Sequence, residues 1–195
     1  MSAPNWTDEP DLTELRQAYD LLTVDRPQAL ARLTSLADRG STISMLYIAK
    51  SYATDNPSKE NLLEAEKWYL KAGEKGSDFA LYSLGKLYIK VGKLGEAKKI
   101  FSSDSLQNYL PAIHELGRMY HYGIGTAIDL ALARSFLERA SAQGHVFAKR
   151  ELAGMLSRGS SGLLQVPRGL YLFAASMVDM IRVLKTESQY SERIG

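Results

Sequence analysis

The chain has 195 residues, of which 45% are hydrophobic and 24% are charged, the proportions of an ordinary globular protein. Its 24 basic and 22 acidic residues give a net charge of +2, which is too small to indicate a nucleic-acid binder by itself. The absence of cysteine excludes disulfides, thiolate catalysis and cysteine-bound metals, and it fits the cytoplasmic location that we expect.

The first residues, 1–11, are acidic and lack an apolar run, so we expect an extended or disordered N-terminus and no signal peptide. The longest apolar stretch near the C-terminus covers residues 169–178. It is shorter than the roughly 20 residues that cross a bilayer, and no transmembrane segment is therefore predicted.

Two kinds of segment alternate along the rest of the chain. The first contains two small residues and closes with a bulky one, and it occurs at 44–52, 80–88, 112–120 and 148–156. The second begins with alanine and closes with glycine or asparagine, and it occurs at 29–40, 65–76, 97–108 and 133–144. In both kinds the successive copies lie 36, 32 and 36 residues apart, so the chain is a repeat.

Apolar residues at intervals of three and four predict an amphipathic helix for every segment. Each unit is then a helix A, a connection, a helix B and a turn. Asp25, Asn61 and Asp129 are predicted to cap the second helices, which should end in left-handed residues at Gly40, Gly76, Asn108 and Gly144.

Residues 12–23 supply a degenerate first helix, and 167–185 supply a long last one. The fold class predicted is all-α, as one solenoid over residues 12–185 of about five helix–turn–helix repeats, with a polar tail at 186–195. The predicted units are 12–42, 43–78, 79–110, 111–146 and 147–185.

The fourth unit resembles the Sel-one-like repeat (SLR) family, a branch of the tetratricopeptide superfamily. The resemblance is carried by Leu116, Gly117, Tyr120, Gly123, Gly125, Asp129, Ala133, Phe136, Leu137, Ala140, Gly144 and Ala148. The unit at 43–78 lacks the loop glycines, 79–110 has the ordinary tetratricopeptide spacing, and the last unit has Gly169 in place of alanine. This resemblance implies a right-handed α/α solenoid that serves as an adaptor or scaffold for other proteins.

The sequence predicts no catalytic or metal-binding site. Gly123 and Gly125 follow a helix and lack the Gly-Lys-Ser/Thr of a phosphate loop, so they are interpreted as a spacer. His114 and His121 would lie about 10 Å apart along one helix, too far to share a metal ion. We therefore expect a non-enzymatic protein without a cofactor.

By resemblance to the superfamily, the concave face is lined at four positions of each helix A. Of the sixteen residues at these positions, six are Lys or Arg and none is Asp or Glu. The residues predicted to bind a partner are Lys50, Tyr82, Lys86, Lys90, His114, Arg118, His121, Tyr122 and Arg150. A groove for an acidic peptide or a C-terminal carboxylate is one interpretation, and a solvated face with an accidental charge bias is the other. Nucleic acid, RNA in particular, is the alternative partner for the same groove.

The last helix is more apolar than a single neighbouring helix can cover. Its candidate contact residues are Leu170, Phe173, Met177 and Ile181. We expect a homodimer first and a docking site for another protein second. Coverage by the tail and attachment to a membrane surface are the remaining alternatives.

Overall fold

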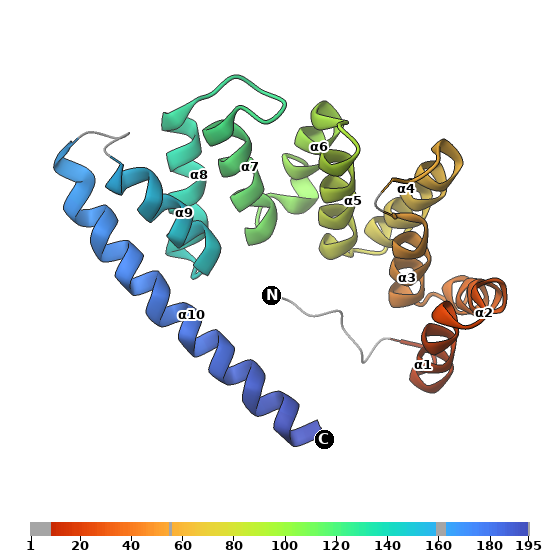
Figure 1. Ribbon diagram of the computed structural model, residues 1–195. Helices are drawn as coiled ribbons and strands as arrows, with labels where there is room; N and C mark the ends of the chain where they lie inside the picture. The colour runs from red at the N-terminus through yellow and green to blue at the C-terminus, as the bar shows by residue number, and fades with distance from the viewer. Residues whose placement is uncertain (1–8, 55, 159–162, 195) are drawn as a thin grey trace. The chain divides into compact units, whose positions relative to one another are not determined.

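The computed structural model describes residues 9–54, 56–158 and 163–194, and every regular element in these ranges is a helix. They form two compact units, Met1–Leu106 and Gln107–Gly195 (Figure 1). The all-α repeat fold is thereby confirmed. The sequence predicts a single solenoid over residues 12–185, and the continuity of its stack across the boundary at residue 106 stays a prediction.

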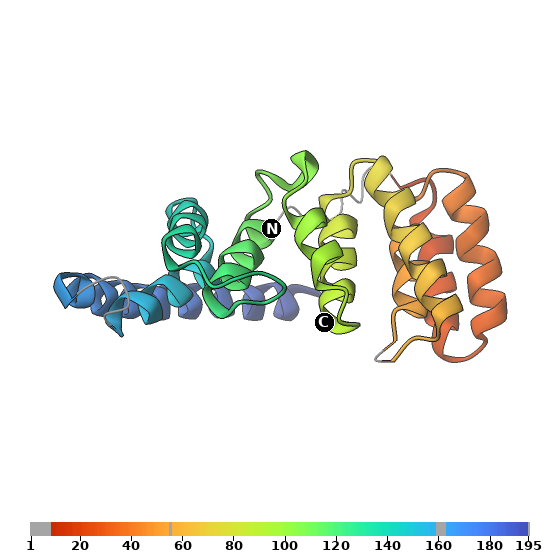
Figure 2. The same ribbon diagram turned by 90° about the horizontal axis from the view of Figure 1, so that it is seen from above.

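The first unit contains three successive helix pairs. Its elements are α1 (Leu12–Asp20), η2 (Leu21–Thr23), α2 (Arg26–Asp38), α3 (Thr42–Tyr52), α4 (Lys59–Glu74), α5 (Asp78–Lys90), α6 (Leu94–Phe101) and η3 (Asp104–Leu106). Within this unit each α-helix packs on its neighbours in the chain, from α1 against α2 through to α5 against α6, as expected for a stack of repeats (Figures 1 and 2).

The second unit contains two further pairs, and its last helix is the longest of the described part of the chain. The elements are α7 (Leu110–Tyr122), α8 (Leu130–Ala142), α9 (Val146–Ser157), η4 (Leu163–Gln165) and α10 (Val166–Ile194). The predicted last helix, 167–185, therefore continues through residues that the sequence analysis assigned to a tail. Figure 1 shows α10 running back along α9, so that its second half extends beyond the start of α9.

Side-chain caps fix where most helices begin. Asp25 and Asp129 accept hydrogen bonds from the backbone N–H three residues later, as predicted. The prediction for Asn61 is wrong, because Ser58 caps α4 and Asn61 lies within its first turn, donating its N–H to the Ser58 hydroxyl.

Glycine ends the second helices where the spacing predicted it. Gly40, Gly76 and Gly144 have φ angles of 102°, 85° and 87°, a conformation that favours glycine. Asn108 was predicted to do the same and does not, because every described residue with positive φ is a glycine and α6 already ends at Phe101. Gly123 ends α7 with φ 70°, which agrees with its interpretation as part of a spacer.

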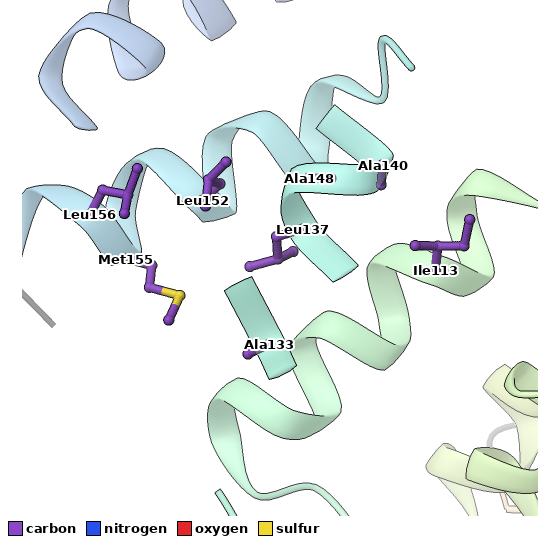
Figure 3. Packing of buried hydrophobic residues seen from close by; sticks show 8 residues of the cluster. All are labelled: Ile113, Ala133, Leu137, Ala140, Ala148, Leu152, Met155 and Leu156. Atoms are coloured by element: carbon purple, nitrogen blue, oxygen red, sulfur yellow. The ribbon is translucent and has the colours of Figure 1, made fainter. Parts of the chain in front are cut away.

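Small residues let each helix A approach its helix B closely. A Cβ atom on Gly117 of α7 would lie 2.9 Å from the side chain of Leu137 on α8. Leu137 is fully buried, and Figure 3 shows it between α7 and α9. The buried cluster around it contains Ile113, Ala133, Leu137, Ala140, Ala148, Leu152, Met155 and Leu156.

Candidate partner-binding groove

The first unit has an apolar groove of about 720 Å³ between α3 and α5, which we call the α3–α5 groove. Leu46 and Lys50 of α3 line one wall, one helical turn apart, and Tyr82, Lys86 and Lys90 of α5 line the other. Every one of the four partner-binding residues predicted in this unit, namely Lys50, Tyr82, Lys86 and Lys90, lies in this groove.

The repeat pattern explains why these side chains face the groove. Ala49 is fully buried within the helix stack. A Cβ on Gly85 would lie 2.4 Å from the ring of Phe101, so this side of α5 packs directly on α6. Tyr82 and Lys86 lie four residues apart and therefore share the helix face that lines the groove. The Tyr82 ring lies 5.9 Å from the ring of Phe101 and so extends from the α5–α6 contact to the groove.

Lysines are the only charged residues among the described lining residues of the groove. Lys50 is exposed, and Lys86 is half-buried with its stem against the apolar lining. The Nζ of Lys90 donates a hydrogen bond to the backbone O of Thr54 at 3.0 Å, joining the two walls of the groove. The result is an apolar and aromatic floor with cationic groups around it.

A second depression of about 600 Å³ adjoins the first and shares Tyr47 and Lys50 with it. Tyr19 of α1 lies against Tyr47, with 4.6 Å between the ring centroids. Burial raises the pKa of Tyr47, and nearby Tyr19 and Glu9 raise it further. The Tyr47 hydroxyl therefore stays protonated at neutral pH and can donate a hydrogen bond.

The second unit holds the other five predicted residues, and their surroundings differ. Arg118 pairs with Glu115 at 3.3 Å, and Glu115 is only 4% exposed. The Tyr122 hydroxyl donates to Glu151, whose Oε1 also lies 3.4 Å from Nδ1 of His121. None of the predicted groove positions is itself Asp or Glu. The carboxylates of Glu115 and Glu151 nevertheless contact the predicted residues from neighbouring positions.

Arg150 is exposed on α9. The second unit thus presents a mixed-charge surface, in contrast to the lysine-rimmed groove of the first. The basic character that the sequence predicted for the whole face is concentrated in the α3–α5 groove.

A family model, that of the Sel1 repeat, matches residues 43–77 and 110–145. These ranges coincide with the pairs α3–α4 and α7–α8 and with two of the predicted repeat units. The chain contains two Sel1 repeats. The match does not extend to the other pairs, which have the same helix–turn–helix arrangement.

Two solved structures are similar to this chain in fold. One is a protective antigen present in uropathogenic Escherichia coli strains that displays an SLR fold, with a TM-score of 0.62, 18% identity and 83% of this chain covered. The chain spans 37% of that protein. The other is a Sel1 repeat protein from Oxalobacter formigenes, with a TM-score of 0.64, 22% identity, and coverage of 85% of this chain and 69% of that one.

Sel1 repeats generally act as protein–protein interaction modules, on a fold that is in general a non-catalytic scaffold. In this chain, His, Asp and Glu side chains of the described residues nowhere gather in a group of three that suits a metal ion. Of the described helices, none combines the length and the apolarity that a membrane span requires.

Some lining residues of the groove were missed by the sequence analysis, chiefly Tyr47, Tyr69 and Phe79. Phe79 is 45% exposed in the first turn of α5, unusual for a large apolar side chain. Phe147 occupies the equivalent place in α9, six residues before its small residue, and it is also exposed. This recurrence was the signal by which the sequence could have revealed Phe79.

In the second matched Sel1 repeat, His114 is held neutral by its surroundings. The pKa of His114 is lowered from 6.5 to about 4, chiefly by burial and next by neighbouring His145 and Arg118, against opposing effects of Glu115 and Glu151. The His114 and His145 rings lie 5.0 Å apart. His145 Nδ1 also accepts the N–H of Ala148, a bond that requires a neutral nitrogen.

Stability of the protein is therefore expected to fall with pH below about 6.5, where the unfolded chain binds a proton that folded His114 does not. Between this pH and about 4 the loss is at most about 1.4 kcal/mol per pH unit from this residue. Urea unfolding as a function of pH should show a shallower decline for His114→Gln than for the parent. Equal slopes would contradict the assignment, as would an NMR titration in which His114 protonates near pH 6.5.

Proposed function

We propose that this protein is a non-catalytic interaction scaffold whose α3–α5 groove binds an acidic segment of a partner protein. The observation that supports the proposal is the combination of an apolar, aromatic floor with Lys50, Lys86 and Lys90 around it, and no acidic residue among its described lining. A peptide with an apolar side chain between carboxylates complements both features. The apolar group fills the floor, and the carboxylates accept hydrogen bonds from the lysines.

The groove of the first unit is the favoured site over the surface of the second unit. A rim of cations attracts an acidic peptide, whereas Glu115 and Glu151 repel it from His114, Arg118, His121 and Tyr122. The second unit is not expected to supply most of the affinity for such a peptide. Self-association through α10 is a separate proposal that does not use the groove.

Charge reversal at Lys50→Glu/Lys86→Glu is expected to weaken binding of an acidic peptide by about tenfold or more, or at least about 1.4 kcal/mol. The probe is a fluorescein-labelled peptide with tryptophan and leucine flanked by glutamates, measured by anisotropy at low and physiological salt. Parent affinity should decline with salt, because the attraction is between exposed charges.

The matched control is Lys75→Glu/Lys99→Glu, which makes the same change of net charge at exposed lysines on α4's end and α6. The control should bind like the parent. Equal weakening in both double variants would show a general charge effect and contradict the groove. Polyuridylate serves as the competitor, added at the same concentration of charge as the peptide. If it displaces the peptide and binds more tightly, the result would instead support the RNA alternative.

A further inference from the structure

The long helix α10 has one face buried on α9 and another that is apolar and exposed. On the buried face Ser176 is 1% exposed, Leu172 packs against the core cluster, and Asp179 pairs with Lys149 of α9 at 2.7 Å. These positions follow one another at intervals of three and four residues, so they fix how α10 is rotated about its axis. The exposed face is therefore a definite set of residues.

Leu170, Phe173, Met177, Ile181 and Leu184 form the exposed apolar face, which we call the α10 stripe. Each of them is about half exposed, and Met177, at the centre, is 49% exposed. At 100° per residue the five side chains fall within an arc of about 80°, and they extend about 21 Å along the axis. A contiguous exposed apolar stripe of this kind on a helix indicates a further contact.

The spacing of the stripe identifies the kind of partner. Its intervals are three, four, four and three residues, a sequence that reads the same in both directions with Met177 in the middle. A two-fold axis at Met177, perpendicular to the helix, places Leu170 on Leu184 of a second copy, Phe173 on Ile181, and Met177 on itself. Two identical helices in antiparallel orientation thus match at every stripe position, which is what an isologous interface requires.

Residues beside the α10 stripe agree with the same two-fold symmetry. Tyr171 is 73% exposed and lies on the same side of α10 as Lys185. In the antiparallel pair these two side chains from different copies come within one helical turn of each other, where the ammonium group can lie on the ring. We propose that α10 pairs with α10 of a second copy of this chain, antiparallel and centred on Met177.

Engineered cysteines test both the pairing and its direction, because the chain has no cysteine of its own. Met177→Cys should form a disulfide-linked dimer on mild oxidation, since the two-fold axis brings residue 177 against itself. Leu170→Cys and Leu184→Cys should each remain monomeric alone in a denaturing gel and cross-link when mixed. Tyr171→Cys is the exposed control outside the stripe and should not cross-link with itself.

Sedimentation equilibrium of the parent at micromolar concentration should give the mass of two chains, and Met177→Glu should give the mass of one. Met177 is already half exposed, so this variant is expected to keep the parent's circular dichroism. A monomeric parent would overturn the proposal, and so would self-cross-linking of Leu170→Cys as strong as that of Met177→Cys, which indicates parallel helices. If Met177→Glu fails to fold, the cysteine pattern still decides the question.

Discussion

Replacing Gly169 with alanine is expected to lower the free energy of unfolding by about 1–3 kcal/mol. A Cβ at this position would lie 2.4 Å from the backbone N of Ser157 and 2.9 Å from the carbonyl carbon of Leu156. These are main-chain atoms of α9 and its end, which cannot rotate aside, so α10 must shift away from α9. Glycine at position 169, where the resemblance in the sequence leads us to expect alanine, thus has a steric reason.

The sign of this effect separates packing from helix propensity. Alanine favours a helix over glycine by up to about 1 kcal/mol, so propensity alone predicts that Gly169→Ala stabilises the protein. Gly95→Ala is the matched control, because Gly95 lies in the first turn of α6 with no atom within 4 Å of its Cβ position. Urea unfolding should show unchanged or slightly higher stability for Gly95→Ala. Equal stability of the two variants would contradict the close contact between α9 and α10.

The helices could be predicted because repetition makes the pattern redundant. A single copy of an amphipathic segment is ambiguous, but the same irregular spacing in two families of segments predicted each helix from α2 to α9. The predictions that were wrong concern the ends of helices, which local hydrogen bonds determine. In the third pair the hydroxyls of Ser102 and Ser103 bond back to the carbonyls of Lys98 and Ile100, which accompanies the end of α6 before Asn108.

The N-cap of α4 shows a second way in which the spacing of the repeat fails to predict where a helix begins. Asn61 was the predicted cap because it lies at the same distance along the sequence from the repeating alanine as Asp25 and Asp129. The structure places the cap three residues earlier, at Ser58, which gives α4 an additional turn at its start. Both residues suit a cap chemically, so the choice between them depended on the length of the connection before α4.

The candidate site was predictable as a helix face but not in its electrostatics. Register along helix A placed Lys50, Tyr82 and Lys86 on one face, and the structure has them along one groove. It could not reveal that Glu151 of α9 bonds to Tyr122 of α7, because that contact depends on the reach of a long side chain across a helix pair. Charge counted along one helix therefore overestimated how basic the second unit is.

Truncating Leu137 to alanine is expected to cost about 2–5 kcal/mol, the largest loss from any single change proposed for this protein. Leu137 is fully buried on α8 within the cluster of Figure 3, and its removal leaves a cavity that the neighbouring helices can only partly close. Leu130→Ala on the same helix is the control, because Leu130 is already 36% exposed. Denaturant unfolding at neutral pH measures both variants.

Gly117→Ala should cost about 1–3 kcal/mol in the parent, because its new methyl group would lie 2.9 Å from Leu137 Cγ and Cδ2. In Leu137→Ala those atoms are absent, and the methyl group enters the space they leave. The double variant should therefore be more stable than the sum of the two single losses predicts, with a coupling free energy of about 0.5–3 kcal/mol. Gly117→Ala with Leu130→Ala should be additive. Additivity within about 0.3 kcal/mol in the Leu137 pair would show that α7 and α8 can separate without loss. The contact of a small residue with a leucine would then not be what holds this repeat together.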